Sequence, residues 1–143
     1  MAVKGKTLTE WHVSMAPMIS YDFWKKCCGA FAAQLIDQGY ILQAASYLSC
    51  LHQTKEVIAI LLKNTLFLEA WCYAKLHLED GDHLFKDIIE KWTRTLEMNG
   101  NIEGAAYISA LNNNFEKCRD LLRKRRRDEE GDKLLQLVEE KLN

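Results

Sequence analysis

Gly39-Tyr40-Ile41-Leu42-Gln43-Ala44-Ala45 decides the fold of this chain, because it returns later as Gly100-Asn101-Ile102-Glu103-Gly104-Ala105-Ala106. A fainter echo is Thr65-Leu66-Phe67-Leu68-Glu69-Ala70. In this pattern the glycine can end one helix in a left-handed turn, and the small alanines let the next helix approach its neighbours closely. Taking Ala44, Ala70 and Ala105 as equivalent gives spacings of 26 and 35 residues, which bracket the ~34 residues of a tetratricopeptide unit. The alternative is coincidence in a chain rich in alanine and leucine.

Helical spacing of apolar residues continues on both sides of these repeats. Ser20 is the expected N-cap of a helix that Gly39 ends, and Asp82 is the expected N-cap of the clearest helix, about 84 to 96. Further helices are expected at about 41–52, 54–63, 66–78, 102–111, 114–127 and 132–142. No strand pattern competes with them. The sequence therefore predicts an all-α, tetratricopeptide-like, right-handed helical solenoid of about seven or eight helices over residues 20–143.

Residues 1–19 are interpreted as an N-terminal arm. This segment has no sustained period, and Pro17 forbids a helix that runs through it. Trp11, Val13 and Met15 are expected to be available for packing on the domain. Because the helical part ends in a charged helix, the chain is also expected to be a candidate fragment of a longer protein.

Composition and charge limit the function classes. Hydrophobic residues make up 48% of the 143 residues and the formal net charge is -1, so no global field attracts nucleic acid or an anionic membrane. Neither a signal peptide nor a membrane span is expected, so the predicted location is the cytoplasm, with the nucleus as an alternative, and no membrane partner. The five cysteines lack CxxC spacing and are expected to be reduced, buried and structural: Cys27, Cys28, Cys50, Cys72 and Cys118.

No constellation of catalytic residues stands out in the sequence. A G-x-S-x-G elbow and a glycine-rich phosphate loop are both absent. The acids and histidines between His77 and His83 are explained by a solvated turn with a capping aspartate. Cys50-x-His52 with the Cys27-Cys28 pair lacks the spacing of a zinc site. We therefore predict a protein that is not an enzyme and needs no cofactor or metal.

One strong basic cluster, Arg123-Lys124-Arg125-Arg126-Arg127, is the candidate contact for RNA phosphates or a nuclear import signal. Acidic residues follow it at once, and Arg125 with Glu129, or Arg126 with Glu130, can pair at i,i+4. A solvated helix is the favoured interpretation of the cluster. An RNA-binding helical module remains the alternative.

Aromatic residues in or near the alanine-rich helices are the better functional clue. A layer one helix pair thick cannot bury every large side chain within itself. Some of these residues are therefore expected to form the interface of a homodimer, although burial in the core is the preferred explanation for any single one: Tyr47, Phe67, Trp71 and Tyr73.

Several segments resemble the tetratricopeptide-like region of the WD40-bearing Gemin subunit of the survival-motor-neuron (SMN) complex. They are Ala-Gln-Leu-Ile-Asp-Gln-Gly at 33–39, Gln-Ala-Ala-Ser-Tyr-Leu at 43–48, Leu51-His52, the helix start at 66–70 and the segment 96–107. The resemblance implies the homodimerisation module of an RNP-assembly factor that works in small nuclear RNP assembly. Its implied partners are a second copy and other SMN-complex or RNP-assembly proteins, with RNA bound through other regions of the host protein. Subunits of coat and ciliary transport complexes contain helical solenoids with similar sequence patterns. A segment of such a complex is therefore the other alternative.

Overall fold

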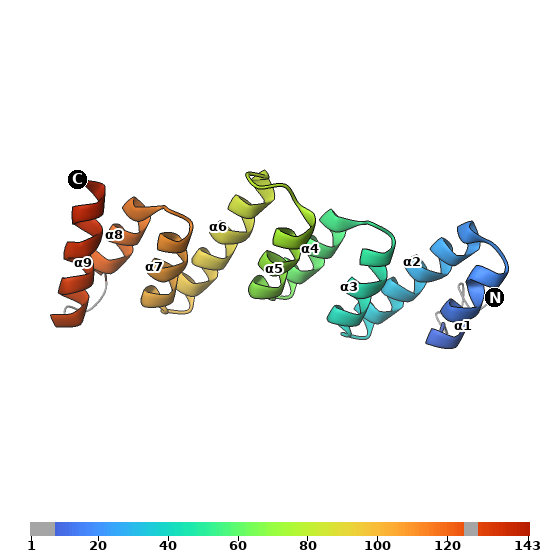
Figure 1. Cartoon of the computed structure of the whole chain (residues 1–143). Helices are drawn as coiled ribbons and strands as arrows, with labels where there is room; N and C mark the ends of the chain where they lie inside the picture. The colour runs from blue at the N-terminus through green and yellow to red at the C-terminus, as the bar shows by residue number, and fades with distance from the viewer. Residues whose placement is uncertain (1–7, 125–128) are drawn as a thin grey trace. The chain divides into compact units, whose positions relative to one another are not determined.

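The computed structural model describes residues 8–124 and 129–143, and all the regular secondary structure in this part of the chain is helical (Figure 1). Its elements are α1 (Glu10–Met15), the 3-10 helix η1 (Ala16–Met18), α2 (Tyr21–Asp37), α3 (Ile41–Cys50), α4 (Thr54–Lys63), α5 (Phe67–His77), α6 (His83–Met98), α7 (Ile102–Leu111), α8 (Phe115–Lys124) and α9 (Glu129–Leu142). The predicted fold class is confirmed. Helices α2 to α9 are the eight that the described part of residues 20–143 contains.

The chain divides into two compact units, Met1–Glu79 and Asp80–Asn143, which we call the first and second unit. In the first unit α1 packs on α2, and each of α2 to α4 packs on the next helix. In the second unit α6, α7, α8 and α9 pack in the same consecutive order. The expectation of one solenoid domain over residues 20–143 stays a prediction.

Five inter-helix turns share one backbone geometry. In each turn one residue has positive φ: Gly39, His52, Thr65, Gly100 and Asn113. The next residue donates its N–H to a carbonyl five residues earlier, as in Tyr40 to Leu35 at 2.8 Å and Asn101 to Leu96 at 2.9 Å. These bonds complete Schellman motifs, which satisfy the last carbonyls of one helix as the next begins.

The positive-φ residues are regularly spaced along the chain. Residues 39, 52 and 65 lie 13 apart, as do residues 100 and 113. Helices α3, α4 and α7, which have described turns at both ends, consequently all have ten residues. Gly39 and Gly100 are 61 positions apart in the sequence. The two most similar repeated segments are therefore separated by several helices. The sequence shows the repeat of Gly39 at Gly100, but the 13-residue spacing of the turns was not predicted, because three of the five turns have no glycine.

Both predicted N-caps are present. The N–H of Phe23 donates to the Ser20 hydroxyl at 3.0 Å, and the N–H of Leu84 donates to Asp82 Oδ1 at 2.9 Å. These bonds satisfy donors that an open helix end leaves without an intrahelical acceptor.

The N-terminal segment is more regular than expected, since α1 and η1 occupy residues 10–18. Leu8 is buried and exchanges two hydrogen bonds with the Gln34 side chain, at 3.0 and 2.7 Å. Val13 packs in the core as expected, but Trp11 and Met15 are exposed. The correction follows from helix geometry, because α1 is too short to turn more than one narrow face inward.

Small residues lie at the centre of each unit. Ala44 and Ala105 are fully buried, and Ala45 and Ala106 are buried beside them. The larger core of the first unit adds Phe31, Leu48, Val57 and Leu61, while the smaller cluster of the second unit adds Cys118 and Leu121.

The expectation that all the cysteines are buried was wrong for two of them. Cys27, Cys28 and Cys118 are buried free thiols, whereas Cys50 and Cys72 are exposed. Each exposed cysteine follows a buried residue, Leu48 or Ala70, by two positions. Two residues rotate about 200° around a helix, so the two thiols point away from the core.

Candidate protein-interaction surface

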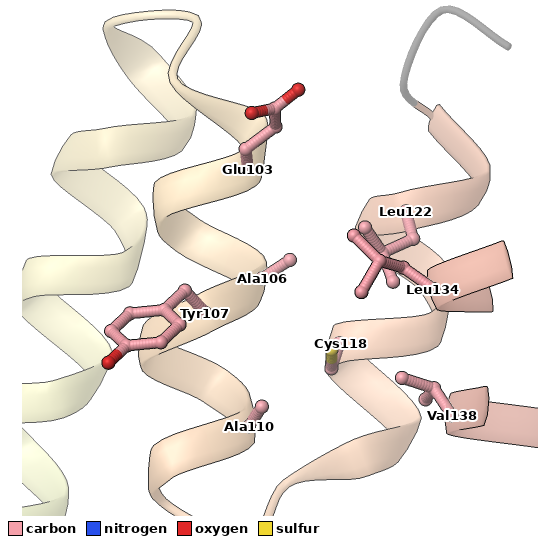
Figure 2. A pocket seen from close by; sticks show the side chains of 8 residues that line it. All are labelled: Glu103, Ala106, Tyr107, Ala110, Cys118, Leu122, Leu134 and Val138. Carbon is pink, nitrogen blue, oxygen red and sulfur yellow. The ribbon is translucent and has the colours of Figure 1, made fainter. Parts of the chain in front are cut away.

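The second unit contains an apolar cleft of about 190 Å³ among α7, α8 and α9. Figure 2 shows Ala106 and Ala110 on α7 facing Cys118 and Leu122 on α8. Small side chains on α7 leave the space open, and Leu134 and Val138 from α9 also line it. Glu103 and Tyr107 complete the lining. Such a concave, largely apolar surface is suited to bind an apolar side chain.

The first unit has a cleft in the corresponding place, among α3, α4 and α5, with a volume of about 370 Å³. Seven of its lining positions recur in the second-unit cleft 61 residues later: 42 and 103, 45 and 106, 46 and 107, 49 and 110, 57 and 118, 61 and 122, 73 and 134. The turns at Gly39 and His52 recur at Gly100 and Asn113, and they explain the six pairs on α3, α4, α7 and α8 because they set the same register in both units. The cleft is therefore a repeated feature of the fold.

The two clefts differ in chemistry. In the first unit Tyr73 donates its hydroxyl to Ser49 at 2.9 Å, and Ser46 and Glu69 also line the cleft. Alanine and leucine replace Ser49 and Tyr73 in the second unit, as Ala110 and Leu134. The first-unit cleft is thus partly polar, whereas the second-unit cleft is more apolar.

Of the four aromatic residues predicted for a dimer interface, Tyr73 lines the first-unit cleft. Tyr47 is half-buried with its ring 4.9 Å from that of Phe31, and burial is the main cause that raises the pKa of its hydroxyl. Phe67 is buried at 8% exposure. Trp71 is half-buried, with Lys75 Nζ 5.6 Å from its ring centroid. The structure does not gather the four into one exposed patch, and their role at an interface stays a prediction.

Three exposed apolar residues in or near the second-unit cleft were not predicted from the sequence. Tyr107 is 65% exposed on α7, and Leu134 and Leu137 are 48% and 60% exposed on α9. A signal was available, because α9 carries apolar residues on two adjacent faces and one neighbouring helix can bury only one of them.

The basic cluster is only partly described. Arg123 donates to Glu139 Oε1 at 2.7 Å, and Lys124 Nζ lies 3.9 Å from Glu97 Oε1. Arg125, Arg126 and Arg127 lie outside the described residues. The two described members therefore have carboxylate partners within the chain.

Consecutive helices joined by recurring tight turns, with the same cleft in each unit, define a helical-repeat protein of the tetratricopeptide-like class. The chain belongs to the family described as the GEMI5 TPR domain, which it matches over residues 1–140. It is 40% identical over 124 residues to Gem-associated protein 5 of Drosophila melanogaster, covering 87% of this chain and 10% of that protein. It is 35% and 36% identical over 105 residues to the Mus musculus and Homo sapiens proteins of that name, covering 73% of this chain and 7% of each relative.

Proposed function

We propose that this chain is the protein-interaction and homodimerisation module of an RNP-assembly factor that works in the SMN complex and small nuclear RNP assembly. Family membership over residues 1–140 is the observation that carries the proposal. The matched segment spans a tenth or less of the length of the curated relatives, so RNP assembly itself belongs to a larger protein.

Exposed apolar side chains support an interaction role. Tyr40, Leu42, Leu68, Tyr107 and Leu137 are all more than half exposed. Exposed apolar residues on a helical-repeat surface are suited to be buried against a partner protein. With a net charge of -1, copies of the chain do not repel one another strongly.

The alternatives have less support. Direct RNA binding through residues 123–127 is weakened by the ion pairs of Arg123 and Lys124. A coat or transport solenoid is disfavoured by the family match. No helix in the described ranges has the length and hydrophobicity needed to span a membrane. The predicted cytoplasmic location remains part of the proposal.

Sedimentation equilibrium of the purified chain between about 1 and 100 µM tests homodimerisation, because a modest specific complex has a Kd near 1 µM. We expect a mass near twice the 16.6 kDa of one chain. A monomer throughout this range would contradict homodimerisation and favour a scaffold for other proteins.

Two aromatic substitutions test the originally predicted interface. Phe67→Glu should unfold the chain, because Phe67 is buried. Trp71→Ala should leave a folded monomer if Trp71 lies at the interface, and a folded dimer if it does not. Leu76→Ala, at a position 81% exposed on α5, is the matched control. Circular dichroism beside light scattering separates loss of folding from loss of dimerisation.

A further inference from the structure

Four exposed residues of α9 form a line along one face of the helix: Glu130, Leu134, Leu137 and Lys141. Their successive spacings of four, three and four residues are those of the contact seam in a pair of packed helices. We call this line the outer stripe. It places two leucines between a carboxylate at one end and an ammonium group at the other.

The adjacent face of α9 holds the helix on the second unit. Gly131 is buried, and Leu135, Val138 and Leu142 are partly buried, again at spacings of four, three and four. Val138 packs against the core cluster of the second unit, and Glu139 accepts a hydrogen bond from Arg123 at 2.7 Å. Because these contacts fix the rotation of α9, they also fix the outer stripe at the surface.

The charges of the outer stripe are complementary to a reversed copy of themselves. Glu130 lies four residues before Leu134, and Lys141 lies four residues after Leu137. A two-fold axis through the middle of the stripe would set two copies of α9 antiparallel. Each Glu130 would then face Lys141 of the second copy, while the leucines meet at the centre.

We propose that the outer stripe of α9 is the surface through which two copies of this chain pair, as an antiparallel helix seam with Glu130 opposite Lys141. This inference rests on the proposed homodimerisation and names the surface that performs it.

The second-unit cleft extends the contact. Leu134 belongs to both the stripe and the cleft, and exposed Tyr107 lies on the other side of the cleft. A copy of α9 seated on the stripe would cover these side chains and remove their apolar surface from water. Lys141 Nζ lies 5.1 Å from the Phe115 ring centroid, which steadies the cation at its end of the stripe.

Charge reversal tests the pairing directly. Glu130→Lys alone, or Lys141→Glu alone, would set like charges against each other at both ends of the seam. Each change should raise the dimer Kd about tenfold or more, because two attractive contacts become repulsive. The double variant Glu130→Lys/Lys141→Glu restores opposite charges and should recover the wild-type Kd. An equimolar mixture of the two single variants should form a heterodimer.

Matched control variants distinguish an effect on the contact between the two copies from an effect on the stability of α9. Asp132→Lys makes the same charge change in the first turn of α9 but lies about 200° around the helix from Glu130. It should leave the Kd unchanged. Leu137→Ser should weaken the dimer at least tenfold, whereas Leu76→Ser, at an 81% exposed position on α5, should not. Circular dichroism verifies that every variant is folded.

The outcomes distinguish the two proposals. A wild-type chain that is monomeric at 100 µM overturns homodimerisation, and this inference with it. A wild-type dimer that folded single charge variants leave unchanged overturns only the outer stripe as its surface. If the single charge variants weaken the dimer, but neither the double variant nor the mixture recovers the wild-type Kd, the antiparallel pairing is also overturned.

Discussion

At the scale of single residues, the left-handed turn positions set where helices end. Gly100 has φ of 78°, and a Cβ added there would meet nothing within 4 Å. Any cost of a side chain at this position is therefore conformational. His52, Thr65 and Asn113 adopt the same region without glycine, which is stable only because the two hydrogen bonds of each Schellman motif and the packed helices around it hold the backbone there.

Gly100→Ala should lower the free energy of unfolding by about 1 kcal/mol, because alanine is disfavoured at positive φ. Gly29→Ala is the matched control. Gly29 lies inside α2, and its added Cβ would meet only Leu51 Cδ1 at 4.0 Å. It should raise the free energy of unfolding by roughly 0.5–1 kcal/mol through helix propensity. Urea denaturation measures the free energy of unfolding of both variants. A change of the same sign in the two variants would contradict the assignment of Gly100 to a positive-φ turn and Gly29 to a helix interior.

The five thiols should differ in reactivity. Burial raises the pKa of the Cys28 thiol to about 11, with smaller contributions from Cys50 and Cys27, and burial also raises the pKa of Cys118. At pH 8 these thiols stay protonated as well as covered, so they are poor nucleophiles. Ellman's reagent should titrate only exposed Cys50 and Cys72 in the native chain, and all five cysteines in urea. Rapid modification of Cys28 in the folded chain would contradict this account.

At the scale of elements, the helix pairs depend on small residues at their crossings. Ala105 on α7 is fully buried, and α7 packs on both α6 and α8. A larger side chain has no space there without separating the helices.

Ala105→Glu should cost at least ~2 kcal/mol of stability, because it buries a carboxylate without a partner or forces the helices apart. Ala59→Glu, at an exposed position of α4, is the control and should stay within ~0.5 kcal/mol of the wild type. Thermal melts followed by circular dichroism compare the two. An unchanged melting temperature for Ala105→Glu would show that α7 is not packed as described.

At the scale of the whole molecule, self-association and folding are linked. If native chains pair and unfolded chains do not, mass action stabilises the native state more at higher protein concentration.

The wild-type melting temperature should therefore rise between about 2 and 200 µM, since this range brackets a micromolar dissociation constant. Glu130→Lys should flatten that rise, and the double variant Glu130→Lys/Lys141→Glu should restore it. Asp132→Lys controls for the charge change alone. A melting temperature independent of concentration in the wild type would argue against a native dimer.

Local patterns were sufficient to predict helices α2 to α9 and the family of this protein, but not α1 and η1. Ser20 and Asp82 were recognised as N-caps, and the bounds of α4 and α7 match the predicted ranges 54–63 and 102–111. This succeeded because capping and the 3.6-residue period depend on residues close together in the chain. The resemblance carried by Gln43 to Leu48 and its neighbours predicted the family that the full-length match shows.

Tertiary structure decided which apolar residues face solvent and which positions form a cleft. Phe67 and Leu134 both lie at helical spacing, yet one is buried and the other is about half exposed. The 61-residue correspondence of the clefts depends on turns at His52 and Asn113 that lack the glycine signal. The sequence by itself determined where helices form, because that choice is local. Only the packing of each helix on its neighbours determined which of its faces remained open for a partner.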